Sequence, residues 1–203
     1  MNIAVLVSGS GTNLQAVIDA VSSGYIKAAV SLVVSDKKDA YALRRARHCG
    51  IETLFVDPKA FRSKEAFDSE IIKHLRRRSV ELVVLAGYMR LLTPHFVKSY
   101  EGRIMNIHPA LLPSFKGTNG VKDALDYGVK ITGPTVHFVT EEVDSGPIIA
   151  QAVVEISDDD TEDSLRQKIH KQEHIIYPRA IKDFVEGRLE IIGRKVVRKE
   201  EER

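Results

Sequence analysis

The chain has 203 residues, 43% of them hydrophobic and 29% charged, so it can bury a sizeable core and lacks the bias of disordered or fibrous proteins. Its 30 basic and 28 acidic side chains give a formal charge of +2, which provides no large field for gripping a nucleic acid. Cys49 is the only cysteine, which excludes an internal disulfide and a cysteine zinc site within one chain and fits a reducing compartment.

Short apolar runs alternate with amphipathic ones in the first half of the chain. The first run, Ile3 to Val7, follows no basic leader and is too short to span a membrane, so we expect a cytoplasmic protein without a membrane partner. Helical spacing is found in two segments, around Leu14, Val17, Ile18 and Val21 and around Phe67, Ile71 and Leu75. Further strands are expected at Val30 to Val34, Thr53 to Val56, Val80 to Ala86 and Arg103 to Ile107.

This strand and helix order predicts an α/β fold with a doubly wound, mostly parallel, Rossmann-like sheet and right-handed crossovers. In the second half, Thr135 to Val139 and Ile148 to Ile156 have strand character on either side of a Gly146-Pro147 turn. An antiparallel addition to the sheet is therefore expected in the C-terminal half.

A long helix is expected to start near Asp160-Thr161, with Leu165, Ile169 and Ile176 on its buried side, and to be kinked or stopped by Pro178. The residues after it become almost entirely charged. We therefore predict a single domain over residues 1–193 and a frayed, charged C-terminal tail over residues 194–203.

The segment Ser8 to Leu14 lies between the first strand and the first helix and is rich in glycine. The free amides at the start of the helix could hold a phosphate on Gly11, Thr12 and Asn13. The dinucleotide fingerprint is incomplete, because its third glycine position is Leu14 and Asp36 cannot be assigned as a ribose-binding acid. One phosphate is favoured over a dinucleotide, and an ordinary glycine turn is the alternative.

Asn106, His108 and Asp144 form the second chemical signal. An imidazole can exchange a proton near neutral pH, an amide can hold an oxyanion without changing charge, and a carboxylate beside the imidazole favours its protonated form. Together these groups suit attack of an amine on a carbonyl carbon, although a histidine at a strand end can also be purely structural. A metal site is the weaker interpretation, because the helical pair His170 and His174 lacks the glutamate of a zincin motif.

Motifs along the whole chain resemble the folate-dependent phosphoribosylglycinamide formyltransferase family. The similar segments are Ser8 to Gln15, Ala86 to Leu92, Asn106 to Pro109, Val136 to Val139, Asp144 to Pro147, and Gln172 to His174. The resemblance implies that a formyl group passes from the co-substrate 10-formyltetrahydrofolate to the amine of 5′-phosphoribosylglycinamide in purine biosynthesis. It implies no metal and no covalent intermediate.

The resemblance also implies a role for each matching position. Asn106, His108 and Asp144 would be catalytic. The phosphoribosylglycinamide would contact Gly11, Thr12, Asn13, His170, Lys171, Gln172 and Glu173. The folate would contact Lys64, Met89, Arg90, Leu91, Leu92, Asn106, Thr140, Glu141, Glu142, Val143 and Asp144. Lys64 departs from the arginine frequent in the family and offers charge without a bidentate fork, and His170 varies among relatives.

Other functions remain as alternatives. A formyltetrahydrofolate hydrolase shares the histidine and aspartate set but is expected to carry an additional N-terminal domain. A methionyl-tRNA formyltransferase is expected to carry a further C-terminal domain and a basic surface. A nucleotide-binding module would use only the glycine loop. The expected partners are small-molecule substrates, with no nucleic acid, and a homodimer is left open.

Overall fold

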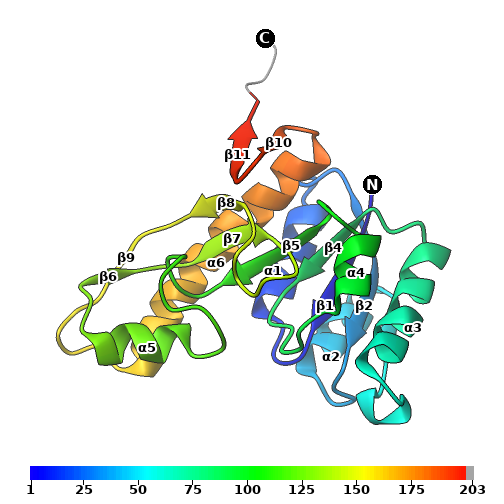
Figure 1. Cartoon of the computed structure of the whole chain (residues 1–203), viewed down its shortest axis with the longest axis horizontal. Coiled ribbons are helices and arrows are strands. Elements are labelled where there is room, and N and C mark those ends of the chain that lie inside the picture. The colour runs from blue at the N-terminus through cyan, green and yellow to red at the C-terminus, as the bar shows by residue number, and fades with distance from the viewer. Residues whose placement is uncertain (200–203) are drawn as a thin grey trace. The chain divides into compact units, whose positions relative to one another are not determined.

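The computed structural model describes residues 1–199. These residues form two compact units, Met1–Met105 and a second unit that begins at Asn106. Figure 1 labels the elements of both units.

The first unit is an α/β unit with a parallel sheet in the order β4-β1-β2-β3. Its strands are β1 (Asn2–Val7), β2 (Ala29–Ser35), β3 (Thr53–Phe55) and β4 (Leu82–Leu85). Its helices are α1 (Thr12–Ser22), α2 (Tyr41–His48), the 3₁₀ helix η1 (Pro58–Ala60), α3 (Lys64–Arg77) and α4 (Pro94–Ser99). β5 (Ile104–His108) crosses from this unit into the second.

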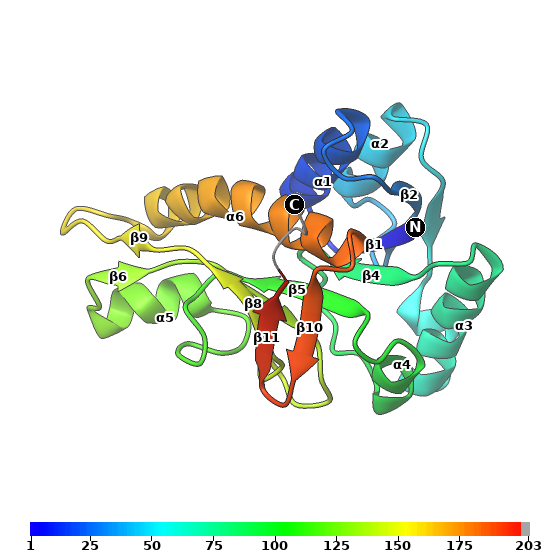
Figure 2. The same ribbon diagram turned by 90° about the horizontal axis from the view of Figure 1, so that it is seen from above.

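The sequence of β1 explains why it is the central strand of this unit. All five residues from Ile3 to Val7 are fully buried, as expected for a parallel strand covered by helices on both faces. Figure 2 shows α1 and α2 on one side of the strands and α3 and α4 on the other. Because parallel strands end at the same edge, the loops after β1, β2, β3 and β4 are brought together there.

The second unit contains a mixed sheet, in which β7 (Thr135–Phe138) is antiparallel to β8 (Ile148–Gln151). Beyond β8 the sheet continues with β11 (Lys195–Arg198), which is parallel to β8 and forms an antiparallel hairpin with β10 (Leu189–Ile192). On the other side, β5 lies beside β7. A second small sheet pairs β6 (Ile131–Thr132) with β9 (Val154–Glu155). The predicted mostly parallel sheet with an antiparallel addition is therefore confirmed.

Two helices complete this unit, α5 (Gly120–Tyr127) and α6 (Glu162–Val185). Thr161 caps α6 through a reciprocal pair of hydrogen bonds with Ser164, which sets the start of the helix where the sequence predicts it. Leu165 and Ile169 are fully buried and pack against Val121 and Val154.

Four expectations from the sequence need correction. The helix does not stop at Pro178, because α6 continues to Val185 and the burial of Tyr177, Ala180 and Ile181 outweighs the hydrogen bond that a proline cannot donate. Ile176 is only partly buried.

The expected strand from Ile148 to Ile156 is two strands, β8 and β9. The break lies where the chain passes Gly133, at which a Cβ atom would come within 1.8 Å of the carbonyl oxygen of Ala152. Residues 195–198, expected in a frayed tail, form β11 because they pair with β10. Residues 200–203 of that tail lie outside the described residues.

Candidate active site

The glycine-rich loop after β1 leads directly into α1. Gly11 caps the helix with a φ of 73°, and a Cβ atom there would lie 2.6 Å from the Cβ of Ala42 in α2. Only glycine fits both the backbone angle and this close approach. The glycine therefore allows the loop to turn directly into the first turn of α1 at Thr12 and Asn13, and a helix N-terminus is an arrangement that suits an anion.

Ser8 connects this loop to two others at the same edge of the sheet. Its hydroxyl donates to Asp36 Oδ1 at 2.6 Å and accepts from the amide of Met89 at 2.9 Å. The amide of Ser8 also donates to the carbonyl of Gly87 at 3.0 Å. Asp36, whose role the sequence leaves unassigned, is buried at the end of β2.

The segment from Met89 to Leu92 presents apolar side chains outward. Met89 is 60% exposed and Leu91 is 66% exposed, while Leu92 is half-buried. The Arg90 guanidinium lies 4.8 Å from the centre of the Phe67 ring. At the end of this segment, buried Asp68 accepts hydrogen bonds at 2.7 Å from both the amide and the hydroxyl of Thr93. Burial raises the pKa of Asp68, opposed by these two hydrogen bonds.

The second unit brings the three predicted catalytic residues together. Asn106 and His108 come from β5, and Asp144 comes from the loop before β8. Asp144 Oδ2 lies 3.6 Å from His108 Nδ1 and accepts a hydrogen bond of 2.8 Å from the amide of Gly117. His108 Nε2 donates to the carbonyl of Phe115 at 2.7 Å, so the Nδ1 atom is the one that faces the carboxylate.

His137 is a further member of this cluster, and the sequence alone indicates only a buried strand residue there. Its Nδ1 donates to the carbonyl of Phe138 at 2.9 Å, and its Nε2 lies 3.2 Å from Asn106 Nδ2. Burial lowers the pKa of His137, so the ring is neutral near pH 7 and its Nε2 accepts from the Asn106 amide. This contact sets the orientation of the Asn106 amide, with its Nδ2 group toward His137. The signal in the sequence is the alternation of Thr135 and His137 on one face of β7.

The loop from Thr140 to Asp144 is held partly by its own hydrogen bonds. Thr140 Oγ1 donates to the carbonyl of Glu142 at 3.2 Å, and Val143 is 44% exposed. Asp144 has a φ of 49°, a left-handed conformation that side chains other than Asn, Asp and Gly rarely adopt. Position 146 requires glycine, because a Cβ atom there would lie 1.7 Å from the carbonyl oxygen of Phe138. Glu141 is exposed on the same loop.

Of the four predicted substrate residues on α6, His170 and Glu173 lie close to each other. Glu173 is buried, and His170 Nε2 lies 3.9 Å from its Oε2. The rings of His170 and His174 stack with centroids 6.2 Å apart, and burial lowers the pKa of both. Within residues 1–199, His174 Nε2 is buried without a hydrogen-bond partner. Lys171 is exposed and Gln172 is half-buried.

Lys64 is exposed as the first residue of α3 and lies in the first unit. Among the described residues, no group of three or more His, Cys, Asp or Glu side chains is placed to hold a metal ion. In the same part of the chain, no helix combines the length and the apolar character needed to cross a bilayer.

The fold is that of the formyl transferases. The formyl transferase family matches residues 1–181, and the chain belongs to this family. It is 48% identical over 191 residues to phosphoribosylglycinamide formyltransferase from Escherichia coli K12, covering 94% of this chain and 90% of that protein. The predicted family resemblance is thereby confirmed.

Solved structures agree with this assignment. Glycinamide ribonucleotide transformylase 1 from Symbiobacterium toebii is 50% identical with a TM-score of 0.97, over 98% of this chain and 94% of the other. A formyltetrahydrofolate deformylase from Pseudomonas syringae pv. tomato is 29% identical with a TM-score of 0.90, over 98% of this chain and 66% of the other. The fold is thus shared with an enzyme of different activity, so function depends on the site.

Proposed function

We propose that this enzyme transfers a formyl group from 10-formyltetrahydrofolate to the amine of 5′-phosphoribosylglycinamide in purine biosynthesis. The similarity to phosphoribosylglycinamide formyltransferases over nearly the whole chain supports the substrate pair. The observation that carries the chemistry is the position of the Asn106 amide, which neutral His137 orients beside the His108 and Asp144 pair.

The reaction begins when the neutral amine of the glycinamide attacks the formyl carbon and the carbonyl oxygen becomes an oxyanion. Asn106 Nδ2 uses one hydrogen toward His137 and keeps a second one for this oxygen. A preorganised donor in a buried site stabilises the developing charge without reorganising during the reaction. The His108 imidazole lies in the same region, with its Nδ1 atom 3.6 Å from Asp144 Oδ2.

The tetrahedral intermediate then breaks its bond to N10 of the folate. The attacking nitrogen must lose one proton, and N10 must gain one. We assign this relay to His108 Nδ1, acting directly or through water, because the Phe115 carbonyl already engages the Nε2 hydrogen. The formyl group ends on the glycinamide nitrogen, and tetrahydrofolate leaves.

The remaining residues would bind the two substrates. We assign the substrate phosphate to Gly11, Thr12 and Asn13, because they lie at a helix N-terminus that Gly11 caps in a left-handed conformation. We assign the ribose and glycinamide end to His170, Lys171, Gln172 and Glu173. The folate would contact Met89 to Leu92, Asn106, Thr140 to Asp144 and Lys64. The exposed Met89 and Leu91 side chains support the apolar part of this assignment.

We also propose that both compact units belong to one formyltransferase domain, which the match over residues 1–181 supports. The domain end at residue 193 and the cytoplasmic location stay predictions, and a homodimer is left open.

A hydrolase is the second candidate, because a formyltetrahydrofolate deformylase shares the fold. The two functions are separated by incubating the protein with 10-formyltetrahydrofolate in the presence or absence of phosphoribosylglycinamide. Loss of the formyl group only when phosphoribosylglycinamide is present supports the proposed transfer. Equal loss without it supports the hydrolase, and no loss in either case refutes both.

A further inference from the structure

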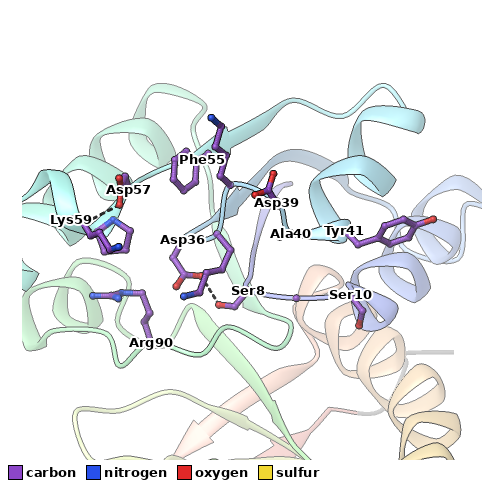
Figure 3. A pocket seen from close by; sticks show the side chains of 14 residues that line it. Ser8, Ser10, Asp36, Asp39, Ala40, Tyr41, Phe55, Asp57, Lys59 and Arg90 are labelled. Carbon is purple, nitrogen blue, oxygen red and sulfur yellow. Dashed lines mark hydrogen bonds between the residues drawn. The ribbon is translucent and has the colours of Figure 1, made fainter.

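The first unit contains a pocket of about 820 Å³ at the carboxyl ends of β1, β2 and β3. Figure 3 shows its lining, which comes from the loops after these three strands and from Arg90. In open α/β sheets, ligands bind outside the carboxyl ends of the strands, and an acid after the second strand commonly binds ribose hydroxyls. Asp36 occupies that position directly after β2.

The carboxylate of Asp36 is buried and held in a fixed orientation. Its Oδ1 accepts the 2.6 Å hydrogen bond from Ser8, and its Oδ2 accepts no hydrogen bond from residues 1–199. Figure 3 shows Asp36 and Ser8 joined by this hydrogen bond at the base of the pocket. One carboxylate oxygen is therefore oriented by the protein, and the other retains its capacity to accept.

Four cationic residues line the same pocket, namely Lys37, Lys38, Lys59 and Arg90. Within the described part of the chain, none of the three lysine ammonium groups forms an ion pair. Three acidic residues line the pocket as well, but Asp36 accepts from Ser8 and Asp57 accepts from the amide of Lys59. The cations are thus available to an anionic ligand.

Aromatic side chains complete the chemistry of the pocket. Phe55, at the end of β3, is 36% exposed, and Tyr41, at the start of α2, is 53% exposed. Figure 3 shows the Phe55 ring at the pocket wall, while Tyr41 points away from Asp36. Phe55 therefore offers a flat apolar face beside the acid and the cations.

We propose that this pocket binds a nucleoside monophosphate, with Asp36 accepting hydrogen bonds from the ribose hydroxyls. The lysine and arginine side chains hold the phosphate, and Phe55 packs against the base. The pocket uses Asp36 and Phe55, to which the proposed formyl transfer gives no role. Ser8 to Ser10 adjoin the proposed phosphate site at Gly11, and Arg90 lies within the segment assigned to the folate, so the bound nucleotide inhibits formyl transfer.

The test is titration calorimetry of the full chain, without other substrates, with adenosine 5′-monophosphate and its 2′-deoxy analogue. A hydrogen bond to a carboxylate gives the ribonucleotide an advantage of about tenfold or more in affinity. Asp36→Asn removes most of this advantage. Asp39→Asn removes the same charge from the pocket and keeps the ribose preference. It tightens both ligands together, because it removes a repulsive charge.

A second variant protects the test against a folding defect at Asp36. Phe55→Ala weakens both nucleotides by the same factor and leaves the ribose preference intact, with thermal melting as the check on folding. Absence of nucleotide binding, or equal affinity of the two nucleotides for the unmodified chain, overturns the proposal. Binding of oligo-γ-glutamate in place of the nucleotides also overturns it. These results do not depend on whether the chain transfers formyl groups.

Discussion

Asp144 and His108 face each other across 3.6 Å, from Oδ2 of the carboxylate to Nδ1 of the imidazole. The other ring nitrogen, Nε2, donates to the Phe115 carbonyl, so Nδ1 is the nitrogen that faces the carboxylate. The two residues come from segments separated by 36 positions, and both are largely buried. This pairing gives the carboxylate an electrostatic role in the proposed reaction.

Replacement of Asp144 by Asn tests that role. Asn also tolerates a left-handed backbone, so the φ of 49° is retained while the charge is lost. We expect kcat to fall by about 10²–10⁴-fold, the usual contribution of acid–base groups, with little change in the thermal midpoint. Steady-state kinetics and thermal melting measure the two effects. Asp126→Asn, which removes an exposed carboxylate from α5, serves as the control, and undiminished turnover in a folded Asp144→Asn protein refutes the role.

The buried imidazole of His137 predicts a pH dependence of stability. Burial lowers the pKa of His137 below 6.5, so the unfolded chain takes up a proton there as the pH falls while the folded chain does not. The unfolded state then binds more protons, and this residue makes stability decrease as the pH falls below about 6.5, by at most about 1.4 kcal/mol per pH unit.

Urea unfolding at about pH 7.5 and about pH 5.5 measures this contribution. His137→Gln retains an acceptor for Asn106 but does not titrate, so it should lose less stability than the unmodified chain over the same interval. The comparison between the two proteins isolates His137 from His170 and His174, whose pKa values burial also lowers. Equal losses in both proteins contradict the prediction.

Gly11→Ala tests the phosphate-binding loop. The added Cβ would lie 2.6 Å from the Cβ of Ala42 in a backbone conformation that favours glycine, so the loop must move. We expect the KM for phosphoribosylglycinamide to rise by about tenfold or more, because a hydrogen bond to a charged group contributes about 1.5–3 kcal/mol. Gly9→Ala is the matched control, since its Cβ would meet nothing within 4 Å. Equal KM values for the two variants would exclude the assignment.

The two hydrogen bonds that Asp68 accepts from Thr93 lead us to expect a link between stability and folate affinity. Asp68→Ala leaves the amide and hydroxyl of buried Thr93 without their acceptor, which should lower the free energy of unfolding by about 1–3 kcal/mol. It should also raise the KM for 10-formyltetrahydrofolate, because the segment Met89 to Leu92 precedes Thr93. Asp68→Asn should recover most of both losses, since one oxygen accepts both bonds. Denaturation and kinetics provide the measurements, with Asp19→Asn as an exposed control. An unchanged KM for the Ala variant would contradict the link.

The sequence predicts the first unit better than the second for a physical reason. From Ile3 to Val7, β1 is apolar, so it can be recognised from its own sequence without knowing which strands pair with it. The break between β8 and β9 depends on how closely Gly133 approaches Ala152, which is a tertiary contact with no local signal. The same holds for β11, whose charged residues are ordered by pairing with β10.

The candidate site shows the same division. Asn106, His108 and Asp144 are recognisable from their chemistry and from the family resemblance. The roles of His137 and Asp36 depend on hydrogen bonds to Asn106 and Ser8, residues 31 and 28 positions away, and such bonds have no signature in sequence spacing. For Lys64 the role comes from the family resemblance alone. The resemblance assigns it a folate contact, and its exposed position on α3 does not test that contact.

The central claim is that the formyl carbon moves to the glycinamide nitrogen at the Asn106, His108 and Asp144 cluster. The most direct measurement follows a carbon-13 label in the formyl group of 10-formyltetrahydrofolate by NMR, for the unmodified chain and for Asn106→Ala. We expect the label to appear as an N-formyl amide only when phosphoribosylglycinamide is present. We also expect the Asn106→Ala substitution to slow the appearance of the labelled amide by about 10²–10³-fold, as loss of an oxyanion donor does. Release of the label as formate without phosphoribosylglycinamide, or an unchanged rate in a folded Asn106→Ala protein, would contradict it.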